Sequence, residues 1–247
     1  MIDVIGGRNI TKTEKAKAVN DRHGNRNSAF ELNLGYVQFP VGYYFYPEFT
    51  YMIWVKTISY NSWQRVIDFG DGPLDNNFFI DHVESTGNVG LFVHGLEINS
   101  DNVAYPLNEW VHVALTSKTK TVLYINGVKT HELDRTMPTT LETANNYVGK
   151  SQFTSDSNIH AVVDDFKIFN RALTVQEIMN EKDKTYEKTS FKLLHVKSSK
   201  SVSSGLVNYW PMAGSLRDIL GGKDMIIKEN GELTTDRFGN KNSGYLF

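Results

Sequence analysis

Carboxylates are the side chains of this 247-residue sequence best suited to acid–base catalysis, and their spacing argues against it. Hydrolysis of a glycosidic bond uses two carboxyl groups that flank the bond. Two residues of one β-strand face the same side only at alternate positions. The nearest pairs, Asp68 with Asp71 and Asp81 with Glu84, are each three residues apart (71 − 68 and 84 − 81). The sequence also has no nucleophile elbow and no phosphate-binding loop, so we predict that the chain is not an enzyme.

Composition argues against zinc, nucleic acid and membrane as partners. The seven histidines lack the paired spacing of zinc enzymes, and the absence of cysteine removes thiolate ligands and disulfides. Lys and Arg number 26 and Asp and Glu 28, a net charge of −2, whereas nucleic-acid binding needs a basic surface. Every apolar run is far shorter than the ~18 residues of a membrane span, so we expect no membrane insertion.

The end of the sequence repeats its beginning. Residues 21–30 (DRHGNRNSAF) return at 236–245 as DRFGNKNSGY, an offset of 215 residues (236 − 21), and Asp3 matches Asp218 at the same offset. A fixed offset is typical of tandem-repeat proteins. We therefore expect this chain to be a slice of a tandem-repeat protein that holds the start of a second unit.

Strand patterns dominate the central part of the sequence. Runs rich in aromatic and β-branched residues, bounded by turn residues, predict strands at 49–56, 65–69, 77–82, 89–94, 109–116, 121–125, 128–130 and 159–169. Asn126-Gly127 favours a tight hairpin between two of these strands. Thr174 and Glu177 have the spacing of a capping box, which predicts one short helix near 174–184. Many short strands and one helix predict an all-β fold, a two-sheet antiparallel jelly-roll sandwich.

Several stretches together resemble the laminin G-like domains of the concanavalin A-like lectin/glucanase group. They are FTYMIWVK (49–56), EWVHVA (109–114), LYINGV (123–128), NYVGK (146–150) and VDDFKIFNRAL (163–173). The resemblance implies two curved antiparallel sheets packed face to face over residues 1–190. GLVNYWPM (205–212) resembles the opening strand of such a domain. We therefore expect residues 1–190 to lack their opening strand, 191–204 to be a linker, and 205–247 to open the next repeat.

The resemblance also implies a structural calcium ion. In related domains an acid of the closing strand often helps to hold calcium, and the acids here are Asp164 and Asp165, which a regular strand would point to opposite faces. Calcium takes six to eight oxygen ligands, many of them backbone carbonyls, so few carboxylates are needed. Asp218 is a further candidate ligand. The alternative is that these acids only make surface hydrogen bonds.

Aromatic residues with polar neighbours are the candidates for ligand binding. Aromatic rings stack on the apolar faces of sugars, and Asn and His supply polar contacts. The family's concave sheet can present such a platform, here Trp110 with His112 and Tyr124 with Asn126, while Trp63 stands in a predicted loop. The alternative for the strand aromatics is ordinary core packing, which Trp and Tyr also serve.

Two functions follow as hypotheses. The first is a non-catalytic binding or adhesion module of an extracellular or cell-surface protein, with a glycan or a protein as partner. The second is head-to-tail assembly into a fibre, because a domain without its opening strand exposes a sheet edge. In that case the strand donors, in cis or to another molecule, are Leu206, Val207, Tyr209, Trp210 and Met212.

Overall fold

The computed structural model describes residues 10–74, 76–139, 141–182, 184, 204–210, 232–234 and 244–246. Strands dominate these residues and one helix, α1 (Val175–Lys182), accompanies them, so the predicted all-β sandwich is confirmed. The strands are β1 (Lys12–Val19), β2 (Ala29–Phe39), β3 (Gly42–Tyr43), β4 (Phe49–Ser59), β5 (Arg65–Gly70), β6 (Asn77–Val83), β7 (Asn88–Val93), β8 (Leu96–Ala104), β9 (Val111–Ser117), β10 (Thr121–Ile125), β11 (Val128–Leu133), β12 (Glu142–Thr143), β13 (Asn145–Val148), β14 (Ile159–Phe169), β15 (Leu206–Trp210), β16 (Glu232–Thr234) and β17 (Gly244–Leu246).

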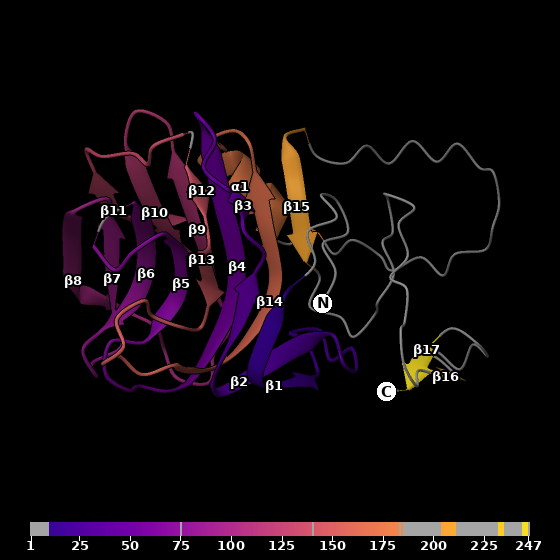
Figure 1. The fold of residues 1–247 in the computed structure, drawn as a ribbon. Helices are drawn as coiled ribbons and strands as arrows, with labels where there is room; N and C mark the ends of the chain where they lie inside the picture. The colour runs from indigo at the N-terminus through magenta and orange to yellow at the C-terminus, as the bar shows by residue number, and fades with distance from the viewer. Residues whose placement is uncertain are drawn as a thin grey trace.

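One antiparallel sheet folds over on itself to make two layers (Figure 1). Its order is β11-β10-β9-β4-β14-β2-β13-β5-β6-β7-β8. The change of layer lies within β2, because residues 30–35 pair with β14 whereas residues 37–39 pair with β13. We call β11, β10, β9, β4 and β14 the β4 layer, and β13, β5, β6, β7 and β8 the β6 layer.

Aromatic side chains fill the space between the two layers. Tyr51 of the β4 layer meets Phe78 of the β6 layer with ring centroids 5.0 Å apart, and Phe69 meets Phe166 at 5.8 Å. All four side chains are fully buried. The Tyr51 hydroxyl donates to the backbone oxygen of Tyr44 at 3.0 Å, which satisfies its one polar group. This packed core fixes the positions of the residues on the outer faces of both layers.

The predicted capping box begins helix α1. The Thr174 amide donates to Glu177 Oε2 at 2.8 Å, and the Glu177 amide donates to Thr174 Oγ1 at 3.3 Å. This reciprocal pair satisfies donors that the first helical turn leaves without partners. The helix ends at Lys182, close to the predicted end. No helix in the described part of the chain is long and apolar enough to cross a membrane.

Helix α1 covers the outer face of the β4 layer. Its Ile178 packs against Met52, Ala114 and Phe169, which project from that face. At the end of the helix, Trp54 Nε1 donates to the Lys182 backbone oxygen at 3.0 Å. A face that helix side chains and backbone cover in this way is a packing surface.

Strand β15 pairs with β14 of the same chain (Figure 1). The pairing is antiparallel and runs from Trp210 opposite Phe166 to Leu206 opposite Phe169. β15 pairs with the same edge of β14 as β2 does, but at a different part of the strand. The predicted strand donors Leu206, Val207, Tyr209 and Trp210 lie in β15, whereas Met212 lies outside the described residues, as do residues 191–203.

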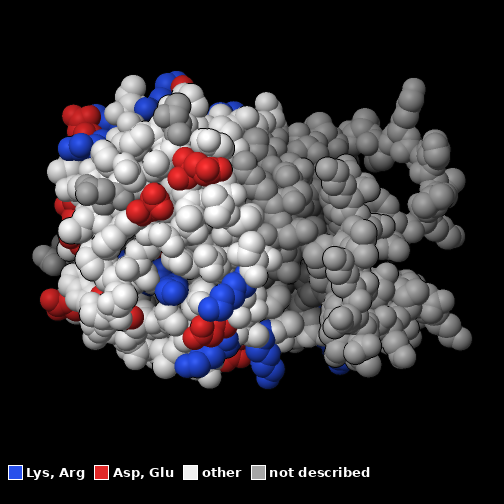
Figure 2. Space-filling model, in the orientation of Figure 1, with Lys and Arg blue, Asp and Glu red and all other residues white. Residues whose placement is uncertain are grey.

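The charged side chains of the described residues are mixed in sign. On the face that Figure 2 shows, both basic and acidic side chains lie among uncharged residues. This distribution agrees with the near balance of 26 basic and 28 acidic residues.

Candidate binding site

The outer face of the β6 layer carries charged and aromatic side chains. Along β6, Phe78 and Ile80 point into the core, so Phe79 and Asp81 point outward by strand alternation. Across the neighbouring strand β5, Asp68 lies opposite Phe79. This face therefore carries polar side chains. A layer whose outer side is covered would have apolar side chains at these positions.

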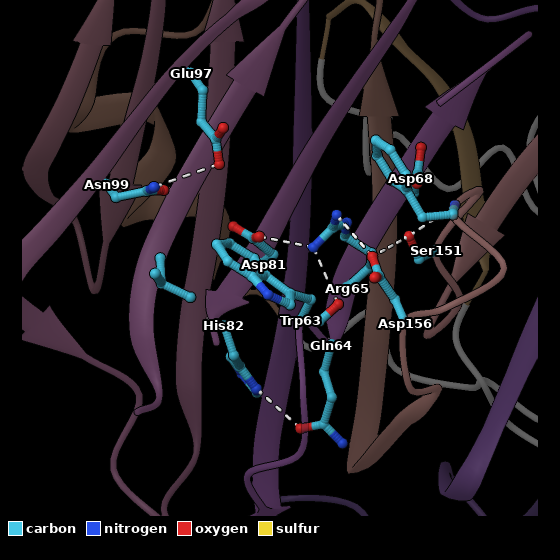
Figure 3. Close-up of polar contacts among 12 residues, drawn as sticks. Trp63, Gln64, Arg65, Asp68, Asp81, His82, Glu97, Asn99, Ser151 and Asp156 are labelled. Atoms are coloured by element: carbon cyan, nitrogen blue, oxygen red, sulfur yellow. Dashed lines mark hydrogen bonds and ion pairs between the residues drawn. The ribbon is translucent and has the colours of Figure 1, made fainter. Parts of the chain in front are cut away.

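Arg65 is the centre of this outer face. Its Nη1 donates to Asp81 Oδ2 at 2.7 Å, and its Nη2 lies 3.0 Å from Asp156 Oδ2 (Figure 3). Its guanidinium carbon lies 4.0 Å from the centroid of the Phe79 ring, a cation–π contact. Asp81 belongs to β6, and Asp156 belongs to the segment between β13 and β14. One buried guanidinium therefore joins the sheet to this segment.

Asp68 makes a second link between the sheet and the same loop. The amide of Gln152 donates to Asp68 Oδ2 at 3.0 Å, and Gln152 Nε2 donates to Oδ1 at 2.7 Å. Burial raises the pKa of Asp68 to about 6, although the hydrogen bonds from Gln152, the charge of Arg65 and the hydrogen bond from Asn77 oppose the rise. Asp68 therefore acts as an acceptor that holds Gln152.

Residues 149–158, which we call the 149–158 loop, are closed at both ends. The Ile159 amide donates to the Gly149 oxygen at 2.8 Å, across the mouth of the loop. Gly149 has φ of +92°, and a Cβ there would meet the Gly35 oxygen at 2.8 Å, so glycine is required. Inside the loop, Ser151 Oγ donates to Asp156 Oδ2 at 2.7 Å. These contacts give the loop one defined shape.

An open cavity of about 470 Å³ lies against the 149–158 loop. Its lining combines two aromatic rings, Tyr147 and Phe153, with amide, carboxylate, hydroxyl and ammonium groups. The Lys150 ammonium lies 5.0 Å from the Tyr147 ring centroid and 4.6 Å from that of Tyr36, which places a cation beside the rings. The remaining lining residues are Gly72, Pro73, Asn145, Ser151, Gln152, Thr154, Asp156 and Asn158.

Four of the sequence-predicted ligand residues lie in or beside the paired strands β9 and β10, where they make packing contacts, and Trp63 lies elsewhere. His112 is 1% exposed, its ring meets the Trp54 ring at 5.1 Å, and burial followed by the charge of Lys167 lowers its pKa well below the usual value. Tyr124 packs with the cluster under helix α1, and Asn126 Oδ1 accepts from the His112 amide at 2.8 Å. Trp110 is half-buried, with the Lys56 ammonium 5.5 Å from its ring. These contacts are those of the packing alternative, and sugar binding by these residues stays a prediction.

Trp63 is the predicted ligand residue that lies nearest to the 149–158 loop. Its backbone oxygen accepts from Arg65 Nη1 at 3.0 Å, and the oxygen of its neighbour Ser62 accepts from the Ser157 amide at 3.0 Å. The residue has φ of 50°, as tight turns require. Trp63 thus belongs to the turn that supports the loop, and it does not line the cavity.

The predicted calcium ligands Asp164 and Asp165 contact an arginine. Arg22 Nη1 donates to Asp164 Oδ2 at 2.6 Å and Nη2 donates to Asp165 Oδ2 at 2.7 Å. The prediction that the two acids face opposite sides is wrong, because Asp165 has φ of 48° and a register shift against β4 lies between Asp164 and Lys167.

Calcium binding by this acidic pair stays a prediction. Both carboxylates are bound to a guanidinium, and the described residues contain no group of three His, Cys, Asp or Glu that could hold a metal ion. Asp218, the third predicted ligand, lies outside the described residues.

Sequence reasoning missed the residues that line the cavity. Tyr147, Lys150 and Phe153 lie in or beside a ten-residue segment between two strands, and the family-like stretch NYVGK (146–150) ends within it. The sequence signal that could have found them is Phe153, an aromatic residue among polar neighbours in a loop. The same kind of signal selected Trp63. What could not be read from the sequence is that Arg65 and Asp68 hold this loop against the sheet.

Comparison with known proteins places the chain in a family. The sequence profile of the concanavalin A-like lectin/glucanases superfamily matches residues 33–179, more than half of the chain. A search among curated proteins found no significant match.

Solved structures with the same fold belong to varied proteins. Domain 4 of AbnA, a GH43 extracellular arabinanase from Geobacillus stearothermophilus, solved in complex with arabinotriose, has a TM-score of 0.57 and 21% identity over 71% of this chain and 88% of that chain. The binding domain of Paraclostridial Mosquitocidal Protein 1 has a TM-score of 0.52 and 17% identity over 70% of this chain and 47% of that chain. A Trypanosoma rangeli sialidase mutant has a TM-score of 0.51 and 15% identity over 68% of this chain and 28% of that chain.

The latter two are therefore much longer chains, of which this chain spans about half or less. At these identities the likeness shows the fold alone. Together with the profile match, it leads to one conclusion: the chain belongs to the concanavalin A-like lectin/glucanases superfamily.

Proposed function

We propose that the chain is a non-catalytic binding module whose ligand is a glycan, and that the glycan binds in the cavity beside the 149–158 loop. The observation that carries this proposal is the composition of that cavity, in which Tyr147 and Phe153 stand beside Lys150 and several amides. Its volume of about 470 Å³ lies within the ~300–1,000 Å³ of small-ligand sites.

The chemistry of the lining suits a sugar. The apolar face of a pyranose or furanose ring packs on an aromatic ring, while its hydroxyls need directed hydrogen-bond partners. Asn145, Gln152 and Asn158 supply amide groups, and Lys150 supplies a cationic donor. The contacts of Arg65 and Asp68 hold the loop before any ligand arrives, which reduces the entropy lost on binding.

The carboxylates near the cavity support a non-catalytic role. A glycosidase needs one carboxyl group that gives a proton and a second that acts as base or nucleophile. Here Asp81 and Asp156 are ion-paired with Arg65, and Asp68 accepts from Gln152 and Asn77. These acids therefore serve to hold the loop.

A glycan-bound structure with this fold supports the choice of a glycan as the ligand. Domain 4 of AbnA has this fold, was solved with arabinotriose bound, and belongs to an extracellular enzyme. By the same analogy, we place this module in a secreted or surface protein, in which tandem copies would raise avidity through effective concentration.

A glycan array followed by titration calorimetry on the full chain tests the proposal. We expect a glycan to bind the wild-type chain and Phe153→Ala to weaken its binding at least ~10-fold, since a stacking ring is lost. Lys150→Ala should weaken binding as well. Tyr43→Ala is the matched control, because Tyr43 is an exposed aromatic residue that lies outside the cavity lining.

Circular dichroism and thermal melting establish that each variant is folded. Unchanged affinity in both Phe153→Ala and Lys150→Ala would exclude this cavity as the binding site. If Trp63→Ala or Trp110→Ala alone abolished binding, the glycan would bind at the sequence-predicted residues instead. An array without any bound glycan would leave a protein as the ligand and contradict the proposal.

A further inference from the structure

Arg22 connects the hairpin of β1 and β2 to strand β14. Its guanidinium forms the two hydrogen bonds to Asp164 and Asp165 described above, and its side chain is only 7% exposed. The guanidinium carbon also lies 4.9 Å from the centroid of the Trp54 ring. Two charge-assisted hydrogen bonds and an aromatic contact make a built receptor for one arginine.

The loop that presents Arg22 depends on three neighbouring residues. The Asp21 carboxylate accepts from the amides of His23 and Asn25, each at 2.9 Å, and from Asn25 Nδ2 at 2.8 Å. Gly24 has φ of +81°, a conformation that L side chains rarely adopt. Asp21, Gly24 and Asn25 therefore define the shape of this loop.

The residue pattern of this loop occurs a second time in the sequence. Residues 236–240 (DRFGN) keep Asp, Arg, Gly and Asn at the positions of Asp21, Arg22, Gly24 and Asn25. His23, which contributes only a backbone amide to the loop contacts given above, is replaced by Phe238. The residues that build the loop are thus the ones that the repeat retains.

The strands on either side of this second loop also match the first hairpin. β16 and β17 pair antiparallel, as β1 and β2 do. Subtracting the offset of 215 from each pair of β16 and β17 gives a pair of β1 and β2. The pairs are Glu232↔Leu246, Leu233↔Tyr245 and Thr234↔Gly244 in the second hairpin, and Lys17↔Glu31, Ala18↔Phe30 and Val19↔Ala29 in the first.

The acidic pair at 164–165 holds Arg22, and the sequence carries a second segment, 236–240, with the residue pattern that presents Arg22. We propose that this acidic pair on β14 is a docking site for the Arg237 loop of a second copy of this chain, which binds there in place of Arg22. The contact joins the tail of one chain to the body of the next, so it is heterologous and adds chains head to tail.

The position of β15 is consistent with this exchange. β15 lies in the C-terminal part of the sequence, as Arg237 does, and its last residue, Trp210, lies opposite Phe166, next to the acidic pair. β14 thus already accepts an element from the C-terminal segment beside the residues that hold Arg22. Within one chain Arg22 has a high effective concentration at the acidic pair, so association of the wild-type chain is weak and removal of Arg22 strengthens it.

Sedimentation velocity of the full chain over a range of concentrations tests the proposal. We expect Arg22→Gln to associate roughly 10-fold more strongly than the wild type, and Arg22→Gln/Arg237→Gln to return to a monomer. Lys241→Gln in the Arg22→Gln background is the matched control. Lys241 occupies the repeat position of Arg26, which is exposed, so this change should leave association unaltered.

Two results would overturn the proposal. One is a folded Arg22→Gln chain that stays monomeric at every concentration. If Arg237→Gln then lowered the melting temperature of this monomer, Arg237 would bind the acidic pair of its own chain, which also contradicts the proposal. The other is association of Arg22→Gln that persists undiminished in the double variant.

A second measurement applies if Arg22→Gln does not fold. A fluorescent peptide of residues 232–247 is titrated into the full wild-type chain, with binding expected for the natural peptide and for its Lys241→Gln form. Binding should be lost with the Arg237→Gln peptide and with an Asp164→Asn/Asp165→Asn chain. Equal binding of the natural and Arg237→Gln peptides would overturn the proposal.

Discussion

Arg65 and Asp81 face each other across β5 and β6, with Nη1 of the arginine 2.7 Å from Oδ2 of the aspartate and both side chains at most 3% exposed. Two charges removed from water depend on each other, since loss of one leaves the other buried without its partner. The same arginine holds Asp156, so the ion pair also connects the β6 layer to the 149–158 loop.

Replacement of Arg65 should therefore be costly. We expect Arg65→Met to lower the free energy of unfolding by about 3–5 kcal/mol, because Asp81 and Asp156 both lose their buried partner. Urea unfolding above pH 7, where Asp81 is charged in the folded chain, measures this loss, and Asp81→Asn in the same chain should recover part of it. Lys129→Met is the control, since the exposed Lys129–Glu132 pair is worth at most about 1 kcal/mol. Equal effects of the two substitutions would contradict a structural role for Arg65.

The pH dependence of stability should reveal the burial of Asp81. Burial raises its pKa to about 7 despite the opposing charge of Arg65, so between pH 4 and 7 the folded chain keeps a proton that the unfolded chain has released. A folded state that binds more protons loses stability as pH rises, here by up to ~1.4 kcal/mol per pH unit. Asp81→Asn removes this contribution. Urea unfolding at several pH values should therefore give a more positive slope for the variant than for the wild type between pH 4 and 7.

His82 should give the opposite slope. Burial lowers its pKa to about 3, and its ring nitrogens lie 3.2 Å from Gln64 Oε1 and 3.3 Å from Thr57 Oγ1. Between about pH 3 and 6.5 the unfolded chain binds a proton that the folded chain excludes, so this group makes stability rise with pH. We expect His82→Gln to make the slope of the unfolding free energy in this range more negative than in the wild type. An unchanged slope would mean that His82 is protonated in the folded chain.

The sequence predicted those parts of the fold that depend on neighbouring residues. The strand at 49–56, the hairpin at Asn126-Gly127 and the capping box at Thr174 each follow from a short pattern, and each is present. The long-range pairs could not be predicted in this way. Arg22 and Asp164 are 142 residues apart in the chain, and the local bulge that turns Asp165 toward Arg22 leaves no mark in the residue types.

The candidate site was missed for the same reason. Its loop is held by Arg65–Asp156 and Asp68–Gln152, pairs that the sheet order brings together from β5 and the segment before β14. The strand aromatics Trp110 and Tyr124 were predicted as ligand residues instead. Sequence alone does not tell which face of a strand a helix will cover.

A larger residue at Gly90 should destabilise the fold. It lies between Asp81 and Asn99 in the sheet, and a Cβ there would be 2.1 Å from Asp81 Oδ1 and 2.7 Å from Asn99 Oδ1. Arg65 restrains Asp81, so the carboxylate cannot move away without loss of the ion pair. We expect Gly90→Ala to cost about 1–3 kcal/mol, as overpacked sites do. The cost should fall when Gly90→Ala is measured in an Asp81→Ala background, and strict additivity in this double-mutant cycle would refute the clash.

Substitutions of Asn126 test whether this predicted ligand residue has a structural role or a binding role. It has φ of 51°, and its Oδ1 accepts from the His112 amide at 2.8 Å while its own amide donates to the His112 oxygen at 2.8 Å. Asn126→Ala loses the side-chain hydrogen bond and places a Cβ at positive φ without compensation, so we expect it to cost about 1–3 kcal/mol of unfolding free energy. Asn126→Gly relieves the backbone strain and should cost less, and Asn126→Asp keeps an acceptor and should cost least.

None of the three Asn126 variants should change glycan affinity, provided that calorimetry is done well below their melting temperatures. Phe153→Ala should show the reverse, with lost affinity and little change in stability, because Phe153 is part-exposed at the cavity and outside the buried core. If Asn126→Ala removed glycan binding while Asn126→Gly and Phe153→Ala did not, the ligand would contact the hairpin of β10 and β11. The opposed responses of these two residues therefore decide between the strand platform and the 149–158 loop.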